Sequence, residues 1–172
     1  MKMAGALALR GAEAVGEYCP IERVLRLLRT PSSVLVLREA FYGATRFDEF
    51  TARTGLAEAT AAARLGELVG AGVLSKRPYQ EPGQRCRHEY VLTASGADLM
   101  PAIYALLEWG NRYAPPPYPP TMHHHGCGER VAIEARCAAG HQVSADDVTV
   151  SAAGPFGLED PKIAEAWDIR TA

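Results

Sequence analysis

Apolar residues recur at helical spacing in four successive stretches of the first half of the chain. In the first stretch, apolar side chains occupy the i, i+3, i+4 and i+7 positions of an amphipathic helix, at Ile21, Val24, Leu25 and Leu28. The first helix is predicted over residues 21–29. Apolar spacing, with glycine as a stop signal, predicts three further helices over residues 30–43, 46–54 and 57–70. A tight turn at Thr54-Gly55-Leu56 joins the last two, which is typical of a helix-turn-helix.

After these helices the apolar pattern changes to alternation. Residues 73–79 and 88–92 are predicted to be short strands, and the polar loop between them contains the turn sequence Pro82-Gly83. A strand, a basic loop and a second strand directly after a helix-turn-helix form a wing. Thr93 is then expected to cap a long helix that runs to about Tyr113. The sequence therefore predicts a mainly α fold with a small β-wing, a winged helix-turn-helix of the α+β class.

A proline-rich segment marks the clearest boundary in the chain. Five of the seven residues from Ala114 to Pro120 are proline, a composition that favours a stiff polyproline II spacer. Beyond it, alternating apolar residues are expected to form a small β-rich appendage. We therefore predict an N-terminal helical extension at 1–17, the winged helix-turn-helix domain at 18–113, a linker at 114–121, a Cys- and His-containing β appendage at 122–157 and a tail at 158–172.

Net charge does not by itself indicate a nucleic-acid partner, because the 172 residues carry −2 at neutral pH. The distribution of charge is more informative. Residues 1–113 hold 14 Lys and Arg against 12 Asp and Glu, a balance of +2, whereas residues 129–172 hold 4 against 8, a balance of −4. The acidic excess lies toward the C-terminal end, and the predicted winged-helix domain is mildly basic.

Signals for export or membrane insertion are weak. The N-terminal apolar run ends at Arg10, which leaves it at the lower limit of a secretory signal, and no run approaches the about 18 apolar residues of a membrane span. The four cysteines are too scattered for a secreted disulfide framework. We expect a cytoplasmic protein with no membrane partner.

With these elements in this order, the chain resembles the HxlR-type winged-helix regulators, bacterial relatives of the MarR group. The resemblance rests on short motifs that follow one another in unbroken order over residues 19–113. They include Cys19-Pro-Ile-Glu-Arg23, Leu37-Arg-Glu-Ala-Phe41, Arg46-Phe-Asp-Glu-Phe50, Ala71-Gly-Val-Leu74, Arg77-Pro-Tyr-Gln-Glu-Pro-Gly83 and Glu108-Trp-Gly110. The resemblance implies a homodimer, held by the N-terminal helix and by the long helix near 95–113. Each subunit would present a recognition helix and a wing to palindromic DNA.

The resemblance also implies which residues contact double-stranded DNA. Thr60 and Arg64 of the recognition helix are the candidates for contacts to base edges in the major groove. Contacts to the DNA backbone are expected from basic residues of the wing and of the helix at 46–54, the first helix of the helix-turn-helix. These residues are Lys76, Arg77, Arg85, Arg87, Arg46 and Arg53. A charged hairpin that is merely solvated is the alternative for the wing.

The recognition helix departs from the family pattern. Family members carry polar and basic residues on its exposed face, whereas the corresponding positions here are Glu58, Ala59, Ala62, Ala63 and Gly66. Alanine discriminates little between bases beyond contact with a thymine methyl group, and a glutamate repels phosphates unless it accepts from cytosine. The sequence therefore predicts a recognition helix with few groups for reading base edges.

Cys19 lies where members of that family carry a cysteine, at the N-terminal edge of the first helix. A position at a helix N-terminus favours a reactive thiol, so Cys19 is a candidate redox sensor. The alternative is a buried and inert cysteine.

The predicted appendage holds two pairs of candidate metal ligands. Two residues separate His124 from Cys127, three separate Cys137 from His141, and nine lie between the pairs. Two Cys and two His at such spacing permit a tetrahedral zinc site. A metal-free β-hairpin built on the valines of the same segment is the alternative.

No nucleophile–base pair, phosphate-binding loop or paired-carboxylate motif stands out, so we do not expect an enzyme. The sequence favours a transcriptional regulator, more specifically a repressor, that acts as a homodimer on a palindromic operator. The alternative is a winged-helix scaffold repurposed for small-molecule binding or catalysis, with DNA binding weakened or lost. A pocket for a small-molecule effector would be lined by Tyr104, Leu106, Leu107 and Trp109 of the long helix, which otherwise are ordinary core residues.

Overall fold

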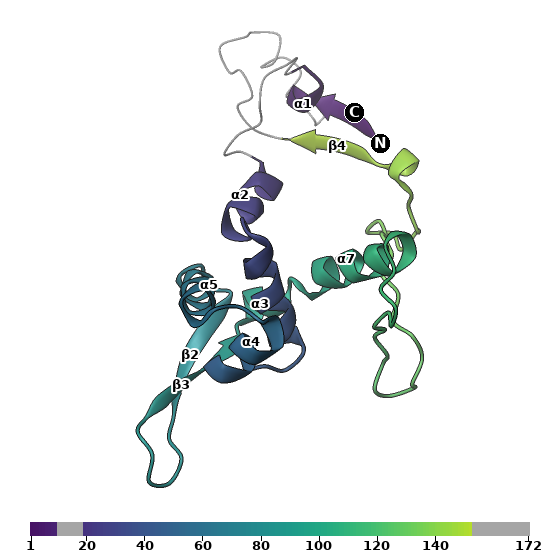
Figure 1. The fold of residues 1–172 in the computed structure, drawn as a ribbon. Helices are drawn as coiled ribbons and strands as arrows, with labels where there is room; N and C mark the ends of the chain where they lie inside the picture. Colours follow the sequence, from purple (N-terminus) through teal and green to yellow (C-terminus); the bar gives the residue numbers. More distant parts are fainter. Residues whose placement is uncertain (10–18, 153–172) are drawn as a thin grey trace. The chain divides into compact units, whose positions relative to one another are not determined.

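The structure, a computed structural model of the chain, describes residues 1–9 and 19–152. The chain divides into two compact units, one formed by Met1–Arg23 with Glu134–Ala172 and the other by Val24–Ile133. Figure 1 shows the elements of both units. The predicted tail at 158–172, the end of the predicted appendage and most of the predicted helical extension lie outside the described residues.

The larger unit has the element order of a winged helix-turn-helix. Its helices and strands are α3 (Pro31–Phe41), α4 (Phe47–Thr54), α5 (Glu58–Gly70), β2 (Leu74–Tyr79), β3 (Arg87–Leu92), α6 (Ala94–Ala97) and α7 (Met100–Tyr113). They are preceded by α2 (Pro20–Leu27), which crosses the boundary between the units. The four predicted helices up to Gly70 and both predicted strands are confirmed, with each end within two residues of the prediction.

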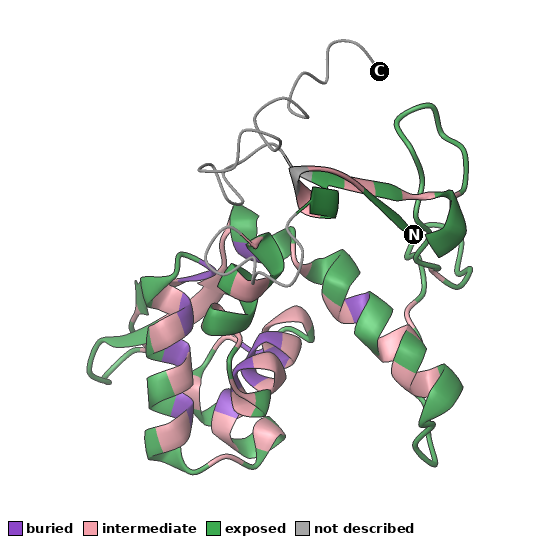
Figure 2. Ribbon diagram, turned by 90° about the horizontal axis from the view of Figure 1, so that it is seen from above, coloured by how far each residue is buried: buried purple, intermediate pink, exposed green. Residues whose placement is uncertain are grey.

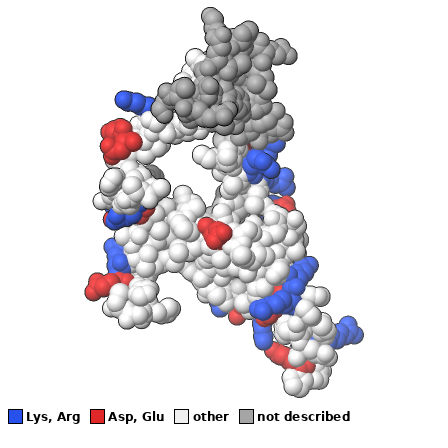
Figure 3. Space-filling view, turned by 180° about the vertical axis from the view of Figure 1, so that it is seen from behind, with Lys and Arg blue, Asp and Glu red and all other residues white. Residues whose placement is uncertain are grey.

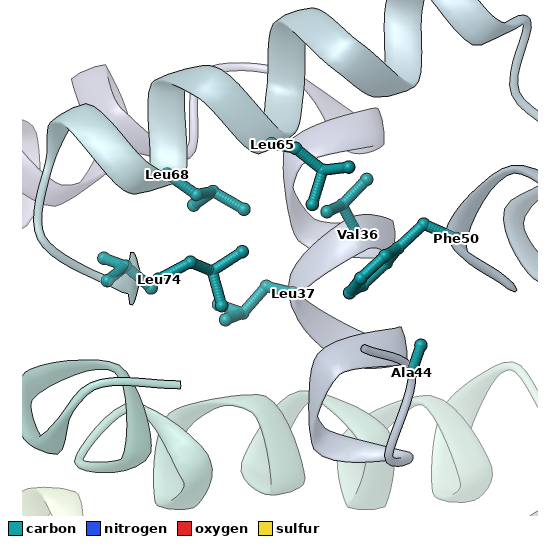
Figure 4. Packing of buried hydrophobic residues seen from close by; sticks show 8 residues of the cluster. Val36, Leu37, Ala44, Phe50, Leu65, Leu68 and Leu74 are labelled. Carbon is teal, nitrogen blue, oxygen red and sulfur yellow. The ribbon is translucent and has the colours of Figure 1, made fainter. Parts of the chain in front are cut away.

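The core of this unit lies where α3, α4, α5 and β2 meet. Val36 and Leu37 of α3, Phe50 of α4, and Leu65 and Leu68 of α5 are fully buried and point toward one another (Figure 4). Figure 2 shows the buried residues on the inward sides of these helices and exposed residues on their outer sides. Burying one such leucine or phenylalanine contributes about 1.5–3 kcal/mol. The cluster therefore fixes the arrangement of the three helices.

Polar groups at the helix ends determine where α3 and α4 begin. The Thr30 hydroxyl accepts a hydrogen bond from the Ser33 backbone N–H at 3.3 Å, as the N-cap prediction requires. Glu49 caps α4, because its Oε2 accepts from the backbone N–H of Arg46 at 3.0 Å and from that of Thr45 at 2.8 Å. These two bonds stabilise the carboxylate and lower the pKa of Glu49.

The wing is an antiparallel hairpin attached to the start of α4. β2 and β3 pair from Leu74 opposite Leu92 to Tyr79 opposite Arg87, and the loop between them projects away from the helices (Figure 1). The backbone N–H of Tyr90 donates to the Thr45 carbonyl at 2.7 Å. This bond joins β3 to the residue that precedes the N-cap of α4.

The long helix predicted from Thr93 to Tyr113 is instead two helices, α6 and α7, so its predicted continuity was wrong. Thr93 does cap the first of them, since its hydroxyl accepts from the Gly96 N–H at 3.1 Å. Pro101 explains the break, because proline has no N–H to donate to the preceding turn and its ring crowds the carbonyl four residues earlier. In the first turn of α7 the same proline is well tolerated.

The smaller unit contains a parallel strand pair. β1 (Lys2–Gly5) pairs with β4 (Thr149–Ala152) and is followed by α1 (Ala6–Leu9), while a 3-10 helix, η2 (Ala145–Asp147), precedes β4. The predicted N-terminal helical extension was therefore wrong for residues 2–5. So short an apolar run makes a marginal helix, whereas β4 supplies backbone hydrogen-bond partners for a strand.

Residues 122–133 belong to the winged-helix unit, although the sequence pattern had assigned them to the appendage. The Tyr104 hydroxyl of α7 donates to the Val131 carbonyl, and Arg130 pairs with Glu108 of α7 at 2.7 Å. These contacts hold the segment after the prolines against α7. The boundary between the units consequently lies after Ile133 and not at 114–121.

None of the helices in the described ranges is both long and apolar enough to cross a lipid bilayer.

Candidate nucleic-acid interface

The helix-turn-helix leaves one side of α5 open to solvent. α4 and α5 are joined at Gly55, whose φ of 68° lies in the left-handed region that glycine adopts without strain. Leu65 and Leu68 direct one side of α5 into the core, so the opposite side is exposed. From α5 the chain passes into β2 through a short turn at residues 71–73, which makes the exposed helix and the wing neighbours along the chain (Figure 1).

The exposed side of α5 carries almost no hydrogen-bonding side chains. Its exposed residues up to Gly66 are Glu58, Ala59, Ala62, Ala63 and Gly66, the positions at which the sequence departs from the family pattern. Thr60, one of the two predicted base-reading residues, is half-buried. Since direct readout requires donors or acceptors that reach base edges, this surface can recognise shape and thymine methyl groups better than hydrogen-bonding patterns.

Arg64 lies against the protein instead of extending from the exposed side of α5. Its side chain is 16% exposed, and its Nη1 lies 2.5 Å from Oε2 of Glu67. Glu67 also accepts from Nη2 of Arg29 at 3.3 Å, which links α5 to the segment before α3. The sequence suggested a base-reading role for Arg64, but the structure gives it packing and ion-pair contacts within the fold.

The wing carries the basic residues that are available to meet phosphates. Arg85 and Arg87 are exposed and have no acidic partner among the residues that the structure describes. Lys76 is exposed, with its ammonium group 5.7 Å from the centre of the Tyr90 ring. Arg77 is paired with Glu89 at 3.3 Å. Figure 3 shows basic side chains along the wing with acidic ones beside them.

Arg46 and Arg53, the two predicted backbone contacts outside the wing, are also paired with carboxylates. Arg53 forms an i,i+4 pair with Glu49 at 3.6 Å. Arg46 pairs with Glu81 of the wing loop at 2.8 Å, and its guanidinium carbon lies 4.9 Å from the centre of the Tyr79 ring. The pKa of Arg46 is raised, first by Glu81 and then by Tyr79.

Sequence reasoning missed Tyr79 and Glu81 as members of this surface. They lie more than thirty residues from Arg46, and no periodic pattern relates a helix N-terminus to a wing loop. The sequence contained one indirect signal. Glu81 is an acidic residue in an otherwise basic wing loop, which indicates that it pairs with a basic residue.

The candidate zinc ligands divide between the two units. His124 and Cys127 lie in the larger unit, with Nδ1 of the histidine 3.2 Å from Sγ of the cysteine across a tight turn. Cys137 and His141 lie in the smaller unit, where the Cys137 N–H donates to the His141 carbonyl at 3.0 Å. Within residues 1–9 and 19–152, no three His, Cys, Asp or Glu side chains gather into a metal-binding group. Only His124 and Cys127 have their ligand atoms in contact, and the complete site stays a prediction.

Cys19 lies directly before α2 and is half-buried, and its carbonyl accepts from the Arg23 N–H at 3.0 Å. The predicted position at the N-terminal edge of a helix is therefore confirmed. Its role as a redox sensor stays a prediction.

A cavity of about 480 Å³ lies between α3 and α7 and is lined in part by the proline-rich segment. Most of its lining is apolar, including Val34, Leu35, Ile103, Leu106 and Leu107. Leu106 and Leu107 were predicted to line an effector pocket, and they line this one. Tyr104 is instead buried, and Trp109 lines a smaller hollow on the same helix.

These features together define a class of protein. An exposed second helix of a helix-turn-helix, followed by a basic hairpin, is the arrangement of winged-helix DNA-binding proteins. The HxlR-like helix-turn-helix family model matches residues 30–118, and the chain belongs to this family.

Comparison with individual proteins supports the same assignment. An uncharacterized HTH-type transcriptional regulator of Mycobacterium tuberculosis is 37% identical over 132 residues, which cover 75% of this chain and 82% of the relative. The crystal structure of PA1607, a candidate transcription factor, is 35% identical with a TM-score of 0.70, covering 80% of this chain and 96% of that one. The structure of PA1374 of Pseudomonas aeruginosa, also a candidate transcription factor, is 34% identical with a TM-score of 0.56. The match covers 86% of this chain and 99% of that one.

The chain is therefore a transcriptional regulator with a helix-turn-helix fold. The predicted family and fold class are confirmed. The relatives are transcription regulators and not enzymes, in agreement with the sequence analysis.

Proposed function

We propose that this regulator is a homodimeric repressor that binds a palindromic operator in the cytoplasm. The observation that carries the proposal is an exposed second helix beside a wing on which Arg85 and Arg87 have no acidic partner within the described ranges. A two-fold dimer presents two such surfaces to successive turns of one duplex, which is why operators of this class are palindromic. Occupation of a promoter by the dimer blocks transcription.

Exposed apolar side chains support the dimer. Ile21 and Leu25 of α2 are 70% and 59% exposed, and Leu106 and Trp109 of α7 are each 62% exposed. Large apolar side chains gathered on one helix are typical of an interface. The family resemblance assigns the dimer contact to these same helices.

The chemistry of α5 indicates how the operator is read. Because its exposed side offers methyl groups and one carboxylate, base-edge hydrogen bonds contribute little, and phosphate contacts and DNA shape contribute most. We therefore expect a modest preference for one operator over random DNA and a strong dependence of affinity on salt.

Selection of binding sites from genomic DNA with the full-length protein tests this function. The expected result is a palindromic consensus with half-sites about one helical turn apart. Replacing both Arg85 and Arg87 with alanine should weaken binding to all sequences alike and reduce the salt slope by about 0.9 for each phosphate that is no longer neutralised. Arg136→Ala, at an exposed arginine outside the wing and outside α2 and α7, is the matched control. Failure of the wild type to bind any fragment at about 50 mM salt would refute the proposal.

The same protein sample tests the dimer by light scattering. The expected mass is twice 18.5 kDa. Trp109→Asp should shift the mass toward a monomer, because it places a charge in the proposed interface. Tyr118→Asp, at an exposed tyrosine of the proline-rich segment, serves as the control.

A small-molecule effector is a second proposal, favoured by the cavity between α3 and α7. Its volume lies in the range of ligand pockets, and its lining suits a largely apolar molecule. α3 packs against α4 and α5 in the core, so a ligand beside α3 can influence the DNA-binding helix. A thermal-shift screen of small apolar compounds, repeated with Leu107→Trp to fill the cavity, should find compounds that stabilise only the wild type.

A further inference from the structure

Arg46 connects the start of α4 to the wing through two contacts. Its guanidinium lies over the ring of Tyr79, the last residue of β2, with 4.9 Å from the guanidinium carbon to the ring centre. Its Nη2 lies 2.8 Å from Oε1 of Glu81 in the wing loop. A planar guanidinium can stack on an aromatic ring and pair with a carboxylate at the same time. A lysine ammonium, as a compact point charge, is poorly suited to making both contacts together.

The preceding residue makes the second attachment of the wing. The Thr45 carbonyl accepts from the Tyr90 N–H of β3 at 2.7 Å. Glu49 holds both residues of this segment, because it accepts from the backbone N–H groups of Thr45 and Arg46. β3 is thus attached through the backbone, and β2 with its loop is attached through the Arg46 side chain. The base of the hairpin is packed into the core through Leu74, Tyr90 and Leu92, and these polar attachments add contacts between the start of α4 and the rest of the wing. Because a two-stranded hairpin is marginally stable by itself, such contacts restrict the direction in which the wing points.

The charge of Arg46 is already compensated, unlike that of the wing-tip arginines. Arg85 and Arg87 have no acidic partner in the described part of the chain, whereas Arg46 faces Glu81. The Arg46 side chain is 45% exposed, so a phosphate near the wing would compete with the Glu81 carboxylate for a guanidinium whose charge is already compensated. Such competition would weaken the contact between Arg46 and Glu81 that holds the wing loop.

We propose that Arg46 is a positioning residue, which clamps Tyr79 and Glu81 to hold the wing at a fixed angle to the helix-turn-helix and does not bind phosphate. The proposal rests on the proposed DNA-binding function and changes the role that the family resemblance assigns to Arg46. It predicts that affinity depends on Arg46 through geometry and not through charge.

The salt dependence of DNA binding separates these two roles. We expect Arg46→Ala and Glu81→Ala in the full-length protein each to weaken binding to the selected operator roughly tenfold, as for one misplaced group of contacts. The slope of log affinity against log salt should stay at the wild-type value, whereas Arg85→Ala should lower it by about 0.9. A reduction of the salt slope by about 0.9 in Arg46→Ala would overturn the proposal.

Glu89→Ala is the matched control for the removal of a wing carboxylate. Glu89 pairs with Arg77 on the wing as Glu81 pairs with Arg46, so both substitutions change the charge near DNA equally. Relative to this control, Glu81→Ala should bind more weakly. Tighter binding by Glu81→Ala than by Glu89→Ala would mean that Glu81 competes with phosphate for Arg46, and the proposal would fail.

Substitutions at Tyr79 test the contact between the ring and the Arg46 guanidinium. Tyr79→Phe keeps the ring and should bind DNA like the wild type, whereas Tyr79→Leu removes the ring and should bind DNA more weakly.

Hydrogen exchange without DNA tests the clamp independently of the proposed function. Amides of β2, β3 and their loop should exchange several-fold faster in Arg46→Ala and Glu81→Ala than in the wild type or in Glu89→Ala. Amides of α3 and α5 should be unchanged, which also shows that the variants fold. If the wild type binds no DNA, the proposed function fails while exchange still decides the clamp. Unchanged exchange rates of the wing amides in both variants would refute the clamp.

Discussion

The side chains of Arg64 and Glu67 lie one turn apart on α5, with Nη1 of the arginine 2.5 Å from Oε2 of the glutamate. Glu67 reaches Arg29 as well, so one carboxylate joins the second helix of the motif to the segment that precedes α3. Arg64 Nε is buried and has no hydrogen-bond partner among the described residues. Arg64 therefore contributes to how α5 is held in the fold, and not to the face that α5 exposes.

Substitutions at Arg64 should affect stability and leave the salt dependence of DNA binding unchanged. Arg64→Met keeps the aliphatic bulk and removes the unpaired Nε, so the free energy of unfolding should change by less than about 1 kcal/mol. Arg64→Ala removes the packing of the aliphatic part of the side chain and should lower the free energy of unfolding by about 1–2 kcal/mol. Urea denaturation measures the stability, and salt titration of operator binding measures the slope. A slope reduced by about 0.9 in Arg64→Met would assign Arg64 to a phosphate after all.

Local features of this fold were predictable because each depends on a few adjacent residues. The Thr30 cap and the Gly55 turn follow from side-chain chemistry within four positions, and both are present. The partners of Arg46 and Arg64 were not predictable, because they depend on how distant segments pack. Both arginines were predicted to contact DNA on the basis of charge and family resemblance. Neither the charge of a residue nor the family resemblance reveals whether a carboxylate lies nearby in the fold. The break before α7 was in principle readable from Pro101, but the apolar periodicity on both sides concealed it.

Gly96 should tolerate no side chain, because α6 passes very close to the residue that precedes β2. A Cβ at this position would lie 2.1 Å from the Val73 carbonyl oxygen. Gly96→Ala should therefore lower the free energy of unfolding by about 1–3 kcal/mol, the cost of overpacking. Gly66→Ala is the matched control, since a Cβ there meets nothing within 4 Å on the exposed side of α5. It should raise stability by about 1 kcal/mol through helix propensity. Equal effects of the two substitutions in thermal denaturation would contradict the close approach at Gly96.

Stability should depend on Glu49 at neutral pH and lose that dependence in acid. The backbone N–H groups of Arg46 and Thr45 lower the pKa of Glu49 in the folded protein below its value in the unfolded chain. A depressed folded-state pKa stabilises the protein above the unfolded pKa, and this contribution is lost as pH falls through the folded pKa.

Glu49→Gln should consequently melt at a lower temperature than the wild type at pH 7, and the difference should shrink as the pH falls below about 4. Melting curves between these pH values measure the effect. Asp48→Asn is the control, because Asp48 lies next to Glu49 in the same turn but makes no capping bond to the N–H groups of Thr45 or Arg46. A melting-temperature difference that grows on acidification would contradict the capping role.

The start of α5 offers a way to stabilise the protein at a single position. Ala57 occupies the N-cap with φ −59° and ψ 143°, and no side chain there accepts from the first turn. The free N–H groups of a helix N-terminus are satisfied best by serine, threonine, aspartate or asparagine at this position. Ala57→Ser should accordingly raise the free energy of unfolding by about 0.5–2 kcal/mol, measured by urea denaturation. Ala57→Val changes side-chain size without adding an acceptor and should give no gain. Equal stability of the serine and valine variants would show that the first turn of α5 has other partners, and the N-cap would then not be the weak point of the recognition helix.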